Sequence, residues 1–151
     1  MRILFKLCVF LLFIATSGCS KKVSRTNIIL NDKPLDVILS YSQGTWKLVY
    51  IDGGFTMIRE NASDSTEWLY LKLSTNRILF KNSARLTLDT TTKWDHVNVF
   101  GDSTFVMHFA DYIGRTPHPE TLGVNRIFND TLILYQPGPD GLFFHYIKSV
   151  F

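Results

Sequence analysis

Hydrophobic residues recur at every second position in short runs from Gly44 to the end of the chain. The clearest run is 83–89, in which three apolar side chains alternate with four polar or charged ones. A period of two is typical of a β-strand that buries one face. Turn residues such as Gly101-Asp102 separate the runs, and no stretch after residue 45 keeps a helical period over three turns. The sequence therefore predicts eight to ten short strands.

An antiparallel meander of such strands has one apolar face to bury. Closing the sheet on itself buries that face and removes the exposed edges. We expect an all-β domain over 34–151, a small up-and-down β-barrel of about eight strands, although the same alternation permits a two-sheet sandwich. A short N-terminal helix should precede the strands, because Pro34 suits a first turn, Asp32 could cap it, and apolar residues recur at helical spacing over 35–39.

The first residues of the chain have the pattern of a targeting segment. A basic start from Met1 to Lys6 precedes an apolar run from Leu7 to Ile14, and small residues then lead to Cys19. The apolar run is shorter than the ~20 residues that a membrane-spanning helix needs. Residues 1–18 are therefore predicted to be a cleaved signal peptide.

The small residues directly before Cys19 resemble the lipobox of bacterial lipoproteins, in which the cysteine becomes a lipidated N-terminus. The leucine usual three positions earlier is Thr16 here. Ordinary cleavage after Ala15-Thr16-Ser17 is the main alternative, and an uncleaved anchor is a second one. Because Cys8 lies in the leader, the mature chain would hold Cys19 alone and could form no internal disulfide. The resemblance implies attachment to a lipid membrane through acylated Cys19.

Residues 19–33 are expected to be the lipidated cysteine and a tether, since Ser20 to Asn27 is polar and basic and shows no periodicity. The apolar patch Ile28-Ile29-Leu30 could dock on the domain. No acidic cluster follows the cysteine, whereas lipoproteins of the Bacteroidetes sent to the cell surface tend to carry one there. By this resemblance we expect the periplasmic face of the outer membrane, with the inner membrane as the alternative.

The charge of the mature chain is small. The 16 basic residues include Arg2 and Lys6 of the leader, so 14 basic side chains remain against 13 acidic ones. A net charge near +1 gives no electrostatic reason to expect a nucleic-acid partner.

Both ends of the predicted domain resemble the lipocalin and fatty-acid-binding superfamily. Gly44-Thr45-Trp46 looks like the G-x-W motif that opens the first strand of that barrel. Asp130 to Leu134 and Asp140 to Lys148 look like the last two strands of the small lipocalin-like domains found in Bacteroidetes lipoproteins. The middle of the chain matches only in its strand rhythm. The resemblance implies that Trp46 and Lys148 form a structural pair at the closed end of the barrel, with a cation–π contact.

The last strand departs from the family at its ligand site. Fatty-acid-binding proteins hold a carboxylate with Arg-x-Tyr, but here Phe144 takes the place of the arginine before Tyr146. A buried carboxylate without a charged donor is costly, so an apolar ligand is expected instead. The chain is rich in aromatic residues, at 14%. The side chains predicted to line a ligand cavity are Tyr50, Phe105, Met107, Phe109, Phe144 and Tyr146.

Two classes of function follow. In the first, the barrel carries a small apolar ligand, and a cavity of ~300 Å³ or more, open opposite Trp46, would favour it. In the second, the same aromatic residues fill the barrel, and a non-catalytic structural or interaction protein binds a protein partner through loops such as Gly114–Thr121. Sequence motifs of hydrolases, metalloenzymes and phosphate-binding loops are absent, so no catalytic residue, metal or cofactor is expected. On strand parity, His108 and His145 should face outward.

Overall fold

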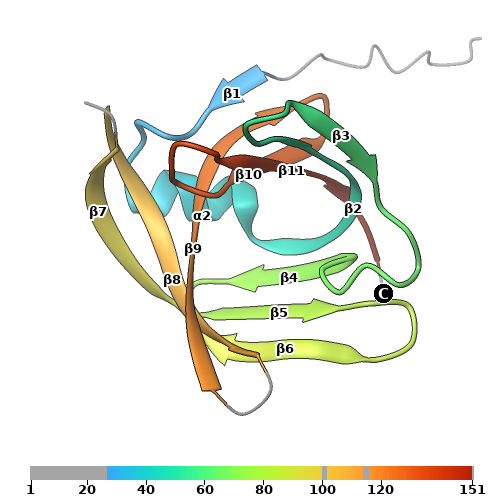
Figure 1. The fold of residues 1–151 in the computed structure, drawn as a ribbon. Coiled ribbons are helices and arrows are strands. Elements are labelled where there is room, and N and C mark those ends of the chain that lie inside the picture. The colour runs from blue at the N-terminus through green and yellow to red at the C-terminus, as the bar shows by residue number, and fades with distance from the viewer. Residues whose placement is uncertain (1–26, 100–101, 114–115, 151) are drawn as a thin grey trace, which may run out of the picture.

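The computed structural model describes residues 27–99, 102–113 and 116–150, and this part of the chain contains one short helix and an 11-stranded sheet (Figure 1). The predicted all-β, barrel-like fold is confirmed, because the strands form one strongly curled antiparallel sheet. The elements are β1 (Asn27–Ile29), α2 (Leu35–Ser42), β2 (Gly44–Gly53), β3 (Ile58–Asn61), β4 (Tyr70–Ser74), β5 (Arg77–Lys81), β6 (Leu86–Thr91), β7 (Lys93–Val99), β8 (Asp102–Ile113), β9 (Thr116–Phe128), β10 (Thr131–Tyr135) and β11 (Leu142–Lys148).

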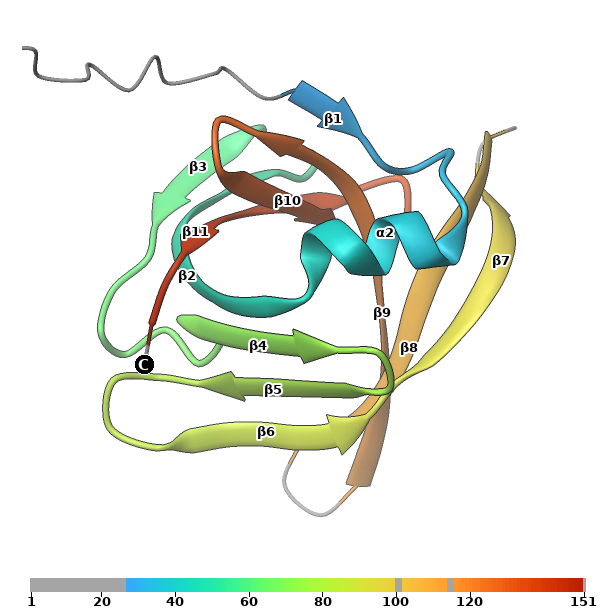
Figure 2. The same cartoon turned by 180° about the vertical axis from the view of Figure 1, so that it is seen from behind.

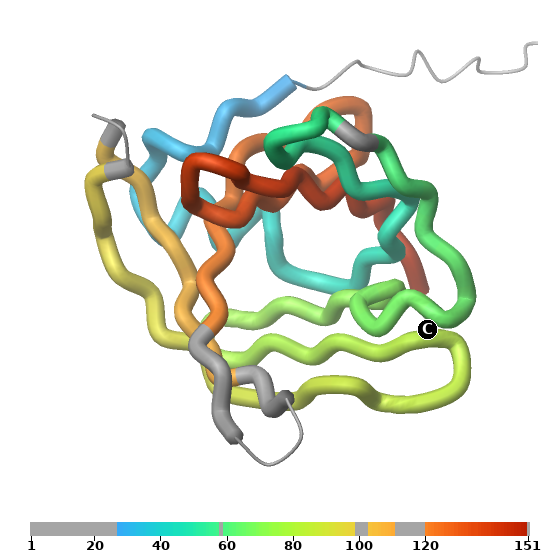
Figure 3. The backbone as a smooth tube through the Cα atoms, viewed as in Figure 1, coloured from blue at the N-terminus to red at the C-terminus, as the bar shows by residue number. Residues whose placement is uncertain are grey.

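The strands follow an up-and-down meander that returns to its start. The order is β6-β5-β4-β2-β11-β10-β9-β8-β7, with β1 beside β9 and β3 beside β2. The last strand, β11, therefore pairs with β2, the first strand of the meander. Only Thr92 separates β6 from β7, so a single bent length of chain leaves one edge of the sheet and forms the other (Figure 3). This corner brings the two edges of the curled sheet together without a ladder of hydrogen bonds between them.

Helix α2 covers one end of the curled sheet (Figure 2). It begins at Leu35, directly after Pro34, whose fixed φ suits the entry to a helix. Ile38 and Leu39 are buried against the barrel. No side chain caps the start of the helix, so the predicted cap by Asp32 is wrong.

The end of the predicted tether is part of the fold. β1 pairs antiparallel with the last residues of β9, and Leu30 is fully buried. The backbone N–H groups of Leu30 and Asn31 both donate to the Asn125 carbonyl, at 2.8 and 3.1 Å. The patch Ile28-Ile29-Leu30 thus docks on the barrel, and residues 27–33 belong with the domain.

The hairpin of β8 and β9 is longer than predicted. Pro117 and Pro119 predict a loop over 115–121, but β9 starts at Thr116 and both prolines are paired with β8. Residues two apart in a strand present their N–H positions to the same edge. β10 pairs with β9 only up to Gly123. Near the prolines, the edge of β9 that faces away from β8 therefore has no pairing with β10, and prolines, which lack an N–H, are tolerated at such an edge.

Aromatic rings pack against one another in the barrel interior. Trp68 stacks on Phe80, with ring centroids 4.7 Å apart, and its ring lies 5.4 Å from that of Phe144 and 6.4 Å from that of Phe109. Phe80 and Phe109 are also in contact, at 6.0 Å. Offset and edge-to-face arrangements of this kind are favourable beyond the area they bury. The hydrophobic alternation of the sequence does not predict that Trp68 points into the barrel.

A β-bulge in β2 changes which residues face this core. His145 pairs with Tyr50 and Tyr146 pairs with Leu48, which leaves Val49 as an extra residue without a partner on β11. Leu48 faces the core before the bulge and Ile51 after it. The prediction that Tyr50 points inward is wrong, because the extra residue shifts the alternation and places Tyr50 on the outer face beside His145.

We expect Phe80→Ala to lower the free energy of unfolding by about 3–5 kcal/mol, since it removes a fully buried ring and leaves a cavity beneath Trp68. Urea unfolding followed by circular dichroism measures this. The control is Phe55→Ala, whose side chain is 90% exposed and whose change should stay within about 0.5 kcal/mol. Equal effects of the two substitutions would contradict the packing described above.

Candidate functional site

Most of the side chains predicted to line a ligand cavity lie in the packed core. Met107, Phe109, Phe144 and Tyr146 are buried there, and Phe105 packs against them at its margin. The Tyr146 hydroxyl donates to the Trp68 carbonyl at 3.1 Å, so its polar atom has an internal partner. These residues contact other aromatic and aliphatic side chains of the barrel.

Trp46 and Lys148 meet at the end of the barrel that α2 covers. The Lys148 ammonium lies 4.1 Å from the centroid of the Trp46 ring, and the Trp46 indole N–H donates to the Ser42 carbonyl at 2.8 Å. Lys148 Nζ also donates to the carbonyl of Gln43, at the C-terminal end of α2, where the helix dipole favours a cation. Gly44 has a φ of +123°, which favours glycine, and a Cβ at this position would lie 3.0 Å from Lys148 Nζ. The G-x-W sequence therefore joins the helix to the first and last strands of the meander.

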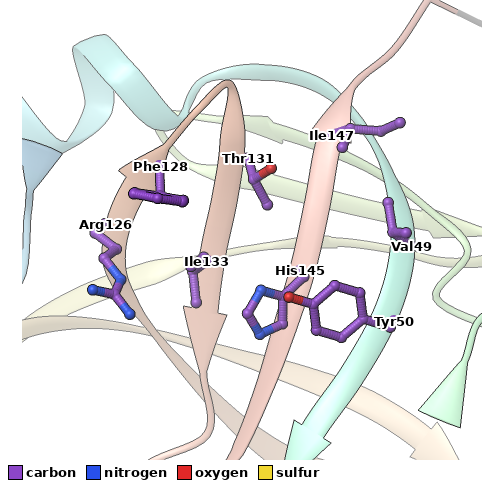
Figure 4. A pocket seen from close by; sticks show the side chains of 8 residues that line it. All are labelled: Val49, Tyr50, Arg126, Phe128, Thr131, Ile133, His145 and Ile147. Atoms are coloured by element: carbon purple, nitrogen blue, oxygen red, sulfur yellow. The ribbon is translucent and has the colours of Figure 1, made fainter. Parts of the chain in front are cut away.

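A groove of about 320 Å³ lies on the outer face of β9, β10, β11 and β2 (Figure 4). We call it the outer groove. Two neighbouring rows of cross-strand partners form it: Ile133 pairs with both Arg126 and His145, and Thr131 pairs with both Phe128 and Ile147. The eight lining residues are Val49, Tyr50, Arg126, Phe128, Thr131, Ile133, His145 and Ile147.

Two bulges bring these side chains to one face. Val49 is the extra residue in β2, and Asn125 is the extra residue in β9, because Ile133 pairs with Arg126 whereas Leu134 pairs with Val124. Val124 faces the core, and the shift sends Arg126 outward. The floor of the groove comes from β10 and β11, and the longer side chains of β9 and β2 form its two walls (Figure 4).

Tyr50 of the β2 wall is stacked between two other planar groups, the His145 imidazole of β11 and the Arg59 guanidinium of β3. The Tyr50 ring lies on the His145 imidazole, with centroids 4.0 Å apart and planes 19° from parallel. The Arg59 guanidinium covers the other face of Tyr50 at 3.7 Å. His145 Nε2 is 3.0 Å from an Asp52 carboxylate oxygen, and only 12% of the His145 side chain is exposed. The ring is therefore fixed in orientation, and its Nδ1 is the nitrogen not used by Asp52.

The rest of the outer groove combines apolar surface with one cation. Val49, Phe128 and Ile147 are 39–45% exposed, which is unusual for large hydrophobic side chains gathered on one sheet face. Arg126 is exposed, and among residues 27–99, 102–113 and 116–150 its side chain makes no hydrogen bond or ion pair. The site can thus hold the apolar body of a ligand next to a ligand group that accepts a hydrogen bond from the Arg126 guanidinium.

A second hollow lies near the corner at Thr92, where β6 leads into β7, and is more open. It measures about 520 Å³ and is lined by residues 90–93 and 108–110. His108 there contacts Thr121 Oγ1 at 2.9 Å and a carboxylate oxygen of Asp95 at 3.5 Å. Within the described part of the chain, no three His, Cys, Asp or Glu residues are grouped closely enough to hold a metal ion.

The outward orientation predicted for His108 and His145 is confirmed, because the His108 side chain is 41% exposed and His145 lines the outer groove. The outer groove was not predicted from the sequence, although the sequence carries a signal for both bulges. In β2, the run Leu48-Val49-Tyr50-Ile51 has four successive hydrophobic residues and so departs from a strict period of two. In β9, the apolar residues Val124 and Ile127 are three positions apart, which also breaks that period. Cys19 and residues 114–115 of the predicted recognition loop lie outside the described residues.

No family model, no curated protein and no solved structure shows a significant match to this chain. None of the helices in the described ranges is long and apolar enough to cross a bilayer.

Burial raises the pKa of the Tyr146 hydroxyl far above its usual value near 10. The folded state then holds a proton that the unfolded state loses, so the stabilisation is complete below pH 10 and declines above it. We expect wild type to lose about 1.4 kcal/mol more stability than Tyr146→Phe between pH 8 and pH 11. Urea unfolding at both pH values tests this, and parallel curves for the two proteins would contradict it.

Proposed function

We propose that the protein is a membrane-anchored periplasmic lipoprotein whose lipocalin-like domain binds a small, largely apolar molecule in the outer groove. The observation that carries the proposal is the combination, in one hollow, of exposed Val49, Phe128 and Ile147 with Arg126, whose guanidinium has no ion pair within the described ranges. The lipobox-like sequence before Cys19 supports the anchoring. The proposal gives the groove no catalytic role.

The packing of the interior favours the groove as the binding site. Inside the barrel, Trp68 contacts Phe80, Phe109 and Phe144, so a ligand at that place would compete with these aromatic contacts. The outer groove is open, and four of its eight lining residues are apolar while the other four carry polar groups that can orient a ligand.

The size and chemistry of the groove restrict the ligand. A volume of 320 Å³ is at the lower end of ligand pockets and holds about ten groups of the size of a water molecule. Phe128, Ile133 and Ile147 favour an apolar body, and Arg126 favours a polar or anionic end. The His145 imidazole on the floor and the Tyr50 hydroxyl at the opposite wall are further polar groups of the lining.

A second candidate is binding of a protein partner through the β8–β9 hairpin. The paired residues of β8 and β9 extend beyond β6 in Figure 1, and the two strands pair as far as Ile113 and Thr116. A projecting hairpin on a rigid barrel is well placed for recognition.

We expect native mass spectrometry of the protein, purified from its own membrane, to detect a small molecule at up to one per chain. Ile147→Glu places a charge against the apolar body and should lower its occupancy at least tenfold. Because the Ile147 side chain is 44% exposed, the fold should tolerate the change. Leu86→Glu, at a similarly exposed site on β6, is the control and should leave occupancy unchanged.

A molecule that survives Ile147→Glu but is lost on Phe109→Leu would lie inside the barrel and contradict the groove. A protein without any such molecule, isolated with a stoichiometric protein partner, would favour the second candidate.

A further inference from the structure

The turn between β2 and β3 displays two large hydrophobic side chains to solvent. Phe55 is 90% exposed and Met57 is 87% exposed, which sets them apart from the other large apolar residues of the neighbouring strands. Isolated exposed hydrophobic residues are common on proteins, but two on one short turn form a small protruding apolar tip.

This turn has a defined backbone shape. The Met57 N–H donates to the Gly54 carbonyl at 3.1 Å, and the Gly54 N–H donates to the Gly141 carbonyl at 3.1 Å. Gly53 and Gly54 have φ values of +104° and +72°, and Met57 has a φ of +49°. Glycine adopts this region without a penalty, but methionine does so at a cost. Met57 therefore adopts a costly backbone conformation although its exposed side chain gains no burial from it.

The tip lies on the side of the domain where the chain enters. Figures 1 and 2 differ by a rotation about the vertical axis, and in both the start of β1, the β9–β10 turn and the β2–β3 turn lie at the upper side. We call this the entry side. Ile29 in β1 is 54% exposed and Phe128 at the end of β9 is 45% exposed, so further apolar side chains lie near the same chain entry.

We infer that the entry side rests on the bilayer and that Phe55 and Met57 enter its headgroup region. The inference rests on the proposed anchoring at Cys19. Asn27 follows Cys19 by only about eight residues, which can span at most about 27 Å. A domain of this length has a radius of gyration of about 14 Å, so such a tether keeps the entry side near the membrane.

The charge of the intervening segment agrees with a lipid surface as the occupant. Lys21, Lys22 and Arg25 lie between the anchor and β1, and the segment has no acidic residue. Basic residues next to an anchor are attracted to anionic lipids and draw the domain toward the surface. Apolar side chains beside such residues then enter the interface, as on peripheral membrane proteins.

The test uses Phe55→Trp in the full chain, isolated from membranes and reconstituted in nanodiscs of phosphatidylcholine and phosphatidylglycerol at 3:1. Discs with brominated phosphatidylcholine quench a tryptophan that reaches the lipid. We expect the added emission, relative to wild type with its Trp46, Trp68 and Trp94, to shift to the blue and to fall at least twofold in brominated discs. Leu86→Trp, on β6 at the opposite side in Figure 1, is the matched control, and its added emission should be neither shifted nor quenched.

If the added emission of Phe55→Trp is unshifted and unquenched in discs that retain the protein, the inference is overturned and the anchoring stays intact. A blue shift without bromine quenching would mean that the turn contacts protein instead of lipid, and it would also overturn the inference. Failure of the anchoring is distinguishable from both, because the chain would then wash off the discs. Equal quenching of the Phe55→Trp and Leu86→Trp variants would likewise contradict a preferred side.

Discussion

The extra residue at Val49 is the constraint on which both faces of the sheet depend. Side chains in a strand alternate strictly, so β2 without a bulge would keep Trp46, Leu48 and Tyr50 on the core side. The bulge lets the first part of β2 bury Trp46 and Leu48 and the second part bury Ile51. Tyr50 is thereby released to stack on His145 outside. The same unpaired residue contributes to the burial of Ile51 in the core on one side and to the β2 wall of the outer groove on the other.

The β2 wall shows how aromatic surface is made compatible with water. Tyr50 has one face on the His145 ring and the other under the Arg59 guanidinium, so little of its π surface meets solvent. Asp52 in turn fixes the imidazole through Nε2. Stacked, hydrogen-bonded groups lose little rotational freedom when a ligand arrives, and a wall of this kind reduces the entropic cost of binding.

Regular alternation makes the fold predictable, and its interruptions make the site unpredictable. The strands, the short helix and the outward histidines follow from period and turn chemistry, and the barrel-like closure follows from the need to bury one face. The prediction for Tyr50 fails because a single inserted residue reverses parity while leaving composition unchanged. The loop predicted around Pro117 and Pro119 is a strand, because sequence alone does not show that one edge of β9 is free of β10 there. The outer groove depends on a row of three residues across neighbouring strands, in which Ile133 pairs with Arg126 on one side and with His145 on the other. Such a row can be recognised only when the strand register is known.

The pairing of β2 with β11 also has a consequence for the order in which the domain can form. Trp46 is the register partner of Lys148, so β2 can complete its pairing only when β11, the last strand of the meander, is available. Contacts between residues so far apart in sequence are slow to form, because the chain entropy lost in closing the loop precedes the gain from pairing. A polypeptide threaded through a membrane from its N-terminus would keep this edge of β2 unpaired until β11 had crossed. Such a chain stays open during translocation and completes its barrel on the far side, which suits the export that we propose for this protein.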